Sequence, residues 1–203
     1  VSNFKSDSYA KHAQDTIAAG NAENNPRVVD FVVREGPSRL DELITWGANF
    51  DKEGNQLHLG KEGGHSANRI VHHKDQSGLH VLTTLIDKVR SLPNVTLLEK
   101  HTLADLITDH HLGEKGGNRC YGAYVISKDD EKILKLTAQV TILSTGGAGQ
   151  VYENTTNPSA ATGDGLGAAY RARVRIKNLH YVQFHPTALY PKINGSTCLI
   201  SEA

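Results

Sequence analysis

The first third of the chain places apolar residues at helical spacing among polar ones. This pattern predicts three helices, at 6–20, 26–35 and 38–46. The break between the second and third falls at Gly36-Pro37, because proline lacks a backbone donor and clashes with the preceding turn of a helix. We therefore expect a helical opening segment that is interrupted at this dipeptide.

The rest of the chain mixes helical spacing with runs of strand type. A loop feeds a short strand near Ile70, and KDDE joins two runs that suit a hairpin. Helices are predicted at 79–92 and 163–173, and strands at 95–102, 103–109, 119–127, 132–138, 139–145 and 178–190. The run at 139–145 is apolar and ends abruptly in glycines, as a strand does where it enters a ligand crevice. The whole pattern predicts an α/β fold with an antiparallel β insertion.

Composition and charge exclude several classes of function. The chain has 203 residues, and its 22 Lys and Arg balance 22 Asp and Glu, which leaves no electrostatic footprint for nucleic acid. No apolar run approaches the roughly 20 residues that a membrane helix needs. The N-terminal sequence does not have the pattern of a signal peptide, and two cysteines, Cys120 and Cys198, favour a reducing compartment over a disulfide framework.

Two glycine-rich segments are candidates for ligand contact. Gly146 and Gly147 in 144–149 allow a backbone to approach a ligand closely, although a tight strand-to-loop turn explains them equally well. Small residues in 162–169 open a helix whose free N–H groups suit anions, and Asp164 there could accept from a ligand or only cap the helix. This second segment is not the dinucleotide fingerprint, which follows a strand directly and has an acidic residue about 20 positions later.

Two polar segments carry candidate side chains. Glu62 lies beside paired glycines in 61–66, where an exposed surface loop is the simpler interpretation. A buried carboxylate there would need a cationic partner, for which a substrate ammonium could serve. His185 ends a predicted strand and could hydrogen-bond a carboxylate, although a lone histidine is more often structural. The pairs of adjacent histidines have no third ligand at zinc spacing, so no metal site is expected.

Four segments together resemble one protein family, in order and over nearly the whole chain. They are 62–72, 141–172, 183–190 and 199–203. They resemble the flavoprotein subunits of succinate dehydrogenase and fumarate reductase and the related L-aspartate oxidases. The resemblance implies FAD as the cofactor and L-aspartate or another C4 dicarboxylate as the substrate. It also implies a partial FAD-binding Rossmann-like fold, followed by the start of a capping domain.

Glu62 discriminates within this superfamily. The succinate and fumarate enzymes typically carry an aromatic residue before the paired glycines, whereas L-aspartate oxidases carry Glu. A negative side chain at this position suits the substrate ammonium, which succinate lacks. The resemblance therefore favours an L-aspartate oxidase that forms iminoaspartate for quinolinate synthase in NAD biosynthesis, in the cytoplasm. A fumarate reductase or succinate dehydrogenase flavoprotein and a non-catalytic domain on the same fold are the alternatives.

The resemblance also implies a role for each position that matches the family's motifs. His185 would hydrogen-bond one substrate carboxylate, Ser201 would contact the far carboxylate, and Glu62 would recognise the amino group. Glu202 would lie beside the active site, where fumarate reductases use a glutamate in a proton relay. The FAD site would include Thr145, Gly146, Gly147 and Asp164, with the backbone of Leu103 near the adenine.

The expected domains are incomplete. Residues 1–178 would form a partial FAD-binding domain without its N-terminal phosphate-binding unit, and 179–203 the start of the capping domain. The family's catalytic arginine and further carboxylate-binding residues follow the segment in which the sequence stops. Methionine is absent and the first residue is Val1, which predicts an internal piece of a longer protein. We expect this piece alone to be inactive and to bind FAD weakly or not at all.

Overall fold

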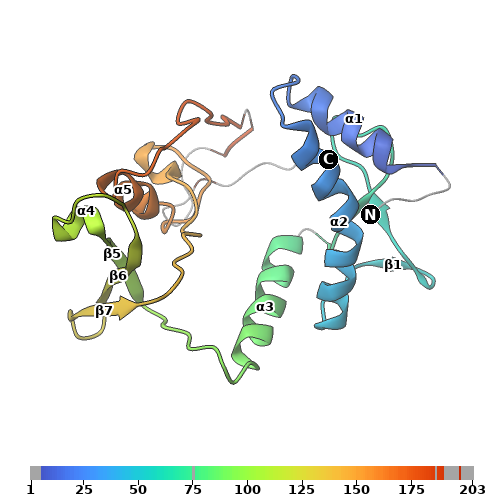
Figure 1. Cartoon of the computed structure of the whole chain (residues 1–203). Coiled ribbons are helices and arrows are strands. Elements are labelled where there is room, and N and C mark those ends of the chain that lie inside the picture. Colours follow the sequence, from blue (N-terminus) through green and yellow to red (C-terminus); the bar gives the residue numbers. More distant parts are fainter. Residues whose placement is uncertain (1–5, 75, 186, 190–196, 198–203) are drawn as a thin grey trace. The chain divides into compact units, whose positions relative to one another are not determined.

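The computed structural model describes residues 6–74, 76–185, 187–189 and 197, and it divides the chain into two compact units. The first unit ends at Leu97 and the second begins at Leu98 (Figure 1). This division follows the contacts within the chain, and the predicted domain boundary at residue 178 stays a prediction. Among the described residues, no helix is long and apolar enough to cross a membrane.

Two packed helices open the first unit. Helix α1 (Tyr9–Ala19) begins after Ser8, whose side chain accepts a hydrogen bond from the Lys11 N–H. Helix α2 (Pro26–Thr45) begins after Asn25, which caps it in the same way, and α1 packs against it. Polar caps of this kind satisfy backbone donors that have no partner within the helix.

Helix α2 runs without interruption through Gly36 and Pro37, so the predicted break there is wrong. Proline removes only one backbone donor, and burial of Val33 and Leu40 on either side holds the helix together. Tertiary packing of an apolar face contributes more to a helix in a protein than intrinsic propensity does.

Short hairpin strands and a third helix complete the first unit. Strand β1 (Lys52–Glu53) pairs with β2 (Gln56–Leu57), and β3 (Leu59–Gly60) pairs with β4 (Ile70–Val71), both antiparallel. Helix α3 (Ser77–Arg90) follows. Residues from α2 and from the segment that follows it form the core, namely Leu40, Ala48 and Phe50. The loop between β3 and β4 holds the predicted polar segment 61–66.

An antiparallel sheet dominates the second unit. Its strand order is β5 (His101–Thr108), β6 (Cys120–Ser127) and β7 (Ile133–Thr137), so the predicted hairpin is confirmed. The predicted strand at 95–102 forms only in its last two residues. Helix α4 (Asp109–Leu112) follows β5, while η1 (Gly149–Val151), a 3₁₀ turn, and α5 (Asp164–Arg171) follow the sheet. Helix α5 packs on β5 around a core of Leu106, Ala168 and Ala172.

The apolar run 139–145 is not a strand, contrary to its sequence pattern. Val140 and Ile142 expose 75% and 82% of their surface, as residues on a paired and covered strand would not. A strand needs a neighbour for its backbone donors and acceptors, and no described strand lies beside this run. The predicted strand at 178–190 is likewise irregular over its described residues.

Candidate functional site

The glycine loop at 144–149 lies against the start of helix α5 in the second unit. The Gly163 N–H donates to the Gly147 carbonyl at 3.2 Å, and the Gln150 N–H donates to the Ala161 carbonyl at 3.0 Å. These two backbone hydrogen bonds join the glycine loop to the segment that leads into α5. The structure thus brings together two of the segments predicted to bind a ligand.

Only glycine fits where α5 meets the loop. A Cβ at Gly165 would overlap the Thr145 hydroxyl and would lie 3.0 Å from Thr145 Cβ. Gly163 has a φ of 78°, and a Cβ there would lie 3.0 Å from Ala148 Cβ. Left-handed backbone and close approach both favour glycine, so this junction depends on these small residues.

The outer side of the glycine loop is open. A Cβ built at Gly146 or Gly147 would meet no heavy atom within 4 Å, so a ligand can reach the backbone of both residues. Helix α5 has no side-chain cap at Gly163, which leaves backbone donors of its first turn without that partner. A helix start with free N–H groups suits a phosphate or a carbonyl oxygen. Asp164 is exposed in this first turn.

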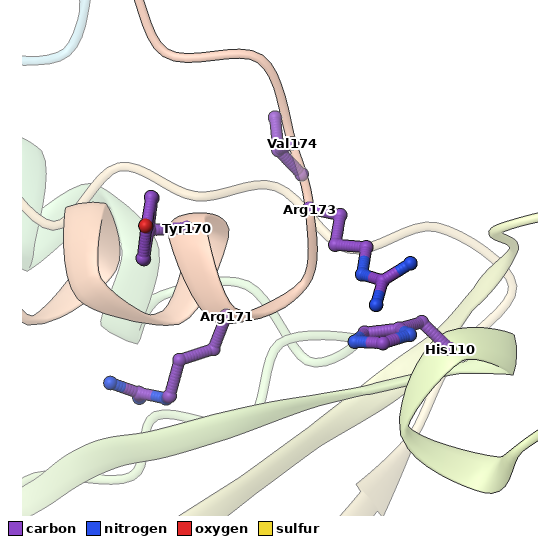
Figure 2. Close-up of a pocket in the computed structure, with 5 residues that line it drawn as sticks. All are labelled: His110, Tyr170, Arg171, Arg173 and Val174. Carbon is purple, nitrogen blue, oxygen red and sulfur yellow. The ribbon is translucent and has the colours of Figure 1, made fainter.

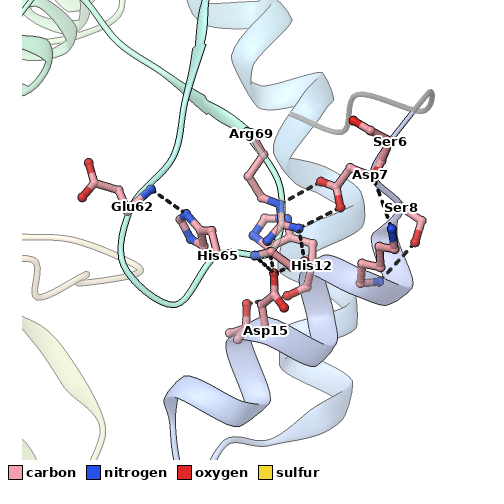
Figure 3. A network of polar contacts seen from close by, with 11 residues as sticks. Ser6, Asp7, Ser8, His12, Asp15, Glu62, His65 and Arg69 are labelled. Atoms are coloured by element: carbon pink, nitrogen blue, oxygen red, sulfur yellow. Dashed lines mark hydrogen bonds and ion pairs between the residues drawn. The ribbon is translucent and has the colours of Figure 1, made fainter.

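The polar segment of the first unit contains a tight turn. The Glu62 N–H donates to His65 Nδ1 at 3.3 Å, and the His65 N–H donates to the Glu62 carbonyl at 3.1 Å (Figure 3). Glu62 is exposed, and its carboxylate has no cationic partner among the residues that the structure describes.

A buried ionic cluster holds this turn against α1. Arg69 donates to both carboxylate oxygens of Asp7 at 2.7 Å and to Asp15 at 2.6 Å. Asp15 also accepts from the N–H and the hydroxyl of Ser66, each at 2.8 Å. These charge-assisted hydrogen bonds connect positions more than fifty residues apart in the sequence.

The cluster shifts the titration of its neighbours. The hydrogen bond from Arg69 lowers the pKa of Asp7. Hydrogen bonds from the Ser66 N–H, from Arg69 and from the Ser66 hydroxyl hold the pKa of Asp15 well below its usual range. Burial and the charge of Arg69 lower the pKa of His12, whose ring lies edge-on to His65 at 6.3 Å. Both carboxyls are therefore ionised at neutral pH, as their pairing with Arg69 requires.

The remaining predicted residues are less constrained. His185 is exposed, and its Nδ1 accepts from the Thr187 N–H at 3.3 Å. Leu103 packs against the core beneath α5, on the edge strand β5. Ser201 and Glu202 lie outside the described residues. Glu62 belongs to the first unit, whereas Leu103, the glycine loop, Asp164 and His185 belong to the second.

A cavity of about 380 Å³ opens at the C-terminal end of α5, beside α4 (Figure 2). Arg171 is fixed there by hydrogen bonds to the Asp105 carboxylate and the Ala104 carbonyl, each at 2.8 Å, which tie α5 to β5. The cavity is lined by His110, Tyr170, Arg171, Arg173 and Val174. None of the predicted site residues is among them, so the cavity lies apart from the glycine loop.

A family model for an FAD binding domain matches residues 2–203. The chain belongs to this family of FAD binding domains. The resemblance found in the sequence is thereby confirmed, and FAD is the cofactor of the family. The open glycine loop and the uncapped start of α5 fit such a group, because both offer backbone donors to phosphate or carbonyl oxygens.

Curated relatives in this family are named L-aspartate oxidases. L-aspartate oxidase 1 of Ralstonia nicotianae is 44% identical over 200 residues, which are 97% of this chain and 37% of that protein. The chloroplastic L-aspartate oxidase of Oryza sativa subsp. japonica is 44% identical over 91% of this chain and 28% of that protein. The chain therefore spans about a third of the length of these relatives.

Solved structures of fumarate reductases share the fold. A quinol fumarate reductase of E. coli matches with a TM-score of 0.75 and 27% identity, over 80% of this chain and 27% of that one. The open conformation of a flavocytochrome c3 fumarate reductase matches with a TM-score of 0.78 and 23% identity, over 97% of this chain and 34% of that one. The predicted fold class, part of an FAD-binding α/β fold with an antiparallel insertion, is confirmed.

The contact between Gly165 and Thr145, where α5 meets the glycine loop, leads to a first testable prediction. Gly165→Ala should lower the FAD affinity of the full-length protein about tenfold, because the new methyl group displaces Thr145 from the start of α5. The loss would oppose helix propensity, which favours alanine over glycine by about 1 kcal/mol. A titration of apoprotein with FAD, followed by flavin fluorescence, measures the effect.

Gly167→Ala is the matched control for this prediction. It is the same substitution in the same helix, and its methyl group would meet only Nη1 of Arg171, at 3.3 Å, the guanidinium nitrogen that makes neither of the two hydrogen bonds to β5. FAD affinity should therefore stay within about twofold of wild type. Equal FAD affinity in both variants would show that the contact between Gly165 and Thr145 does not shape the flavin site.

Proposed function

We propose that the protein containing this chain is an FAD-dependent L-aspartate oxidase, which converts L-aspartate to iminoaspartate. The observation that carries the proposal is Glu62, whose exposed carboxylate lies in a fixed turn beside paired glycines. An unpaired carboxylate suits a substrate ammonium, and relatives that are 40–44% identical are named L-aspartate oxidases.

Each candidate residue has a role in this reaction. Glu62 binds the substrate ammonium, His185 donates to one carboxylate and Ser201 to the far carboxylate. Glu202 would take the place beside the active site from which fumarate reductases relay a proton. The ammonium first loses one proton to base or solvent, which frees the nitrogen lone pair. The Cα–H bond then breaks as hydride leaves, the lone pair forms the C=N bond, and the resulting iminium loses a second proton. When bound, FAD accepts the hydride.

The chain's residues contribute chiefly by positioning. The Cα–H must point at the acceptor within contact distance, and fixed partners for the ammonium and the two carboxylates hold it there. Thr145, Gly146, Gly147 and Asp164 hold the cofactor side of the site, and the Leu103 backbone lies near the adenine. These assignments are supported by the open loop at 146–147 and by its junction with α5.

The proposal includes the cellular context of the reaction. Iminoaspartate is the substrate of quinolinate synthase in NAD biosynthesis, so we propose that enzyme as the functional partner, in the cytoplasm. Dioxygen or fumarate would reoxidise the flavin. Residues 1–178 would belong to the FAD-binding domain and 179–203 would begin the capping domain. Because relatives are about three times as long, these 203 residues alone should not catalyse the reaction.

A fumarate reductase or succinate dehydrogenase flavoprotein is the second candidate. The solved structures of fumarate reductases favour it through their shared fold, with TM-scores of 0.75 and 0.78. Succinate has no ammonium, so it leaves Glu62 without a partner in the site. A non-catalytic domain on the same fold is the third candidate, and loss of FAD binding in the full-length protein would favour it.

Anaerobic flavin reduction separates these candidates. L-aspartate should bleach the visible flavin absorbance of the full-length protein within one turnover, whereas succinate should not. The isolated residues 1–203 are the control, and they should carry less than one FAD per chain and remain unreduced. If succinate bleaches the flavin and L-aspartate does not, the second candidate replaces the first. Full FAD occupancy of the isolated chain would contradict its expected incompleteness.

A further inference from the structure

The ionic cluster around Arg69 is largely buried within the first unit. The side chains of Arg69 and Asp7 are 0% exposed, and that of Asp15 is 18% exposed. Arg69 engages Asp7 through two donors in a fork and reaches Asp15 through a third. A fork of this kind fixes orientation as well as distance, because guanidinium and carboxylate are both planar.

The segment that contains Glu62 is held at Gly60, Ser66 and Arg69. The Arg69 N–H donates to the Gly60 carbonyl at 3.0 Å, which closes the segment at its two ends. Ser66, inside the segment, donates its N–H and its hydroxyl to Asp15 on α1. The Glu62–His65 turn lies between these anchors (Figure 3). Its position against α1 is therefore set by Arg69 and by the carboxylate that Arg69 and Ser66 share.

Stability alone does not account for such a cluster. Buried ion pairs cost desolvation energy, and well-packed apolar residues of similar volume often stabilise a core as well or better. What the cluster adds is directional geometry next to a carboxylate proposed to meet the substrate. Placement errors of about 1 Å in such a group can cost large factors in rate.

We propose that Arg69 is a positioning residue for substrate recognition, which acts through Asp15 and Ser66 to hold the Glu62 turn in place. This inference rests on the proposed function, because it gives Glu62 its task. Arg69 does not touch the substrate. Loss of the Arg69 fork should therefore weaken recognition of the substrate ammonium more than it affects the reaction of a substrate without an ammonium, such as fumarate.

Arg69→Lys in the full-length holoenzyme tests the inference. Lysine keeps the charge but loses the fork, so KM for L-aspartate should rise about tenfold, with kcat and fumarate reduction within about twofold of wild type. Amide hydrogen exchange at His65 and Ser66 should become at least about tenfold faster, because their anchor loosens. Arg34→Lys is the matched control, since Arg34 pairs with Asp30 on the exposed face of α2 and should change none of these values.

A double-mutant cycle separates positioning from general damage. In a Glu62→Gln background, Arg69→Lys should raise KM for L-aspartate by less than about twofold, because the group that it positions has lost its charge. Asp15→Asn provides a second route if Arg69→Lys does not fold. The amide of this variant still accepts from Ser66 but no longer pairs as an anion with Arg69, so the same selective rise in KM is expected.

Several outcomes would overturn the inference. Equal losses toward L-aspartate and fumarate would indicate a purely structural cluster, and unchanged exchange at His65 and Ser66 would show that Arg69 does not hold the turn. Additive effects of Arg69→Lys and Glu62→Gln would do the same. A wild-type protein that fails to oxidise L-aspartate overturns the proposed function instead, and the exchange rates then still decide whether Arg69 sets this turn.

Discussion

Glu62→Gln is expected to lower kcat/KM for L-aspartate about 100-fold in the full-length enzyme, which corresponds to ~2.7 kcal/mol. Glutamine keeps the shape of the side chain and one acceptor but removes the charge that attracts the ammonium. Hydrogen bonds to charged groups are worth about 1.5–3 kcal/mol, and the charge-assisted pair is the stronger kind. Steady-state kinetics with L-aspartate, at a fixed concentration of the electron acceptor, measure the change.

Fumarate reduction by the same variant is the internal control. Fumarate carries both carboxylates of the C4 skeleton but no ammonium, so its kcat/KM should stay within about threefold of wild type. Glu53→Gln changes an exposed glutamate on β1 in the same unit and should leave both substrates unaffected. A parallel loss toward L-aspartate and fumarate would mean that Glu62 supports the site as a whole and does not read the amino group.

Discrimination by charge at this position follows from the chemistry of the two substrates. A carboxylate that faces an ammonium gains an ion pair, whereas one that faces the carbon skeleton of succinate must give up water without compensation. The second situation is unfavourable, so a glutamate both recruits the amino acid and rejects its deaminated analogue. The Glu62–His65 turn is closed by two hydrogen bonds, one from each backbone N–H. It holds the backbone of Glu62 in the fixed orientation that such selectivity needs.

Local patterns predicted the elements whose stability is local. The end of α1 before Gly20, the start of α2 at Pro26, the short strand β4 and the hairpin of β6 and β7 all follow from residues within a few positions of one another. The continuous α2 and the irregular run 139–145 did not follow from such patterns. Packing of Val33 and Leu40 decides the first, and the lack of a neighbouring strand decides the second.

In the candidate site, too, features set by nearby residues could be predicted, whereas those set by distant residues could not. Gly146 and Gly163 adopt left-handed backbone in the glycine loop and at its junction with α5, and such glycines are visible in the sequence. The role of Arg69 was missed, because its partners, Asp7 just before α1 and Asp15 on α1, lie more than fifty positions away. One signal was present: Asp7 and Asp15 are only eight residues apart, so two acids lie close together near the start of the chain. That spacing indicates a shared partner but does not identify it.

Gly122 is the glycine on which the sheet of the second unit depends most. It lies in the central strand β6, opposite Ile107 on β5 and Thr137 on β7. Its φ is 140°, and a Cβ there would overlap the Leu136 carbonyl oxygen and lie 2.9 Å from Thr137 Cα. Backbone atoms of a neighbouring strand cannot move aside as a side chain can. Any larger residue must therefore separate β6 from β7 or force the strand into another conformation.

Gly122→Ala should accordingly lower the free energy of unfolding of the second unit by about 3 kcal/mol, through backbone strain together with the clash. Urea unfolding followed by far-UV circular dichroism measures the loss, and hydrogen exchange in β6 locates it. Gly117→Ala is the matched control in the loop before β6, where a methyl group would lie 3.4 Å from Asp109 Oδ2 in ordinary contact, and it should change stability by less than about 0.5 kcal/mol. Because α5 packs on this sheet and carries Gly165 against the glycine loop, FAD affinity should fall with the sheet in Gly122→Ala. Unchanged stability would show that β6 can adjust at this position. Unchanged FAD affinity in a destabilised sheet would show that the glycine loop at 144–149 does not depend on the sheet for its FAD-binding geometry.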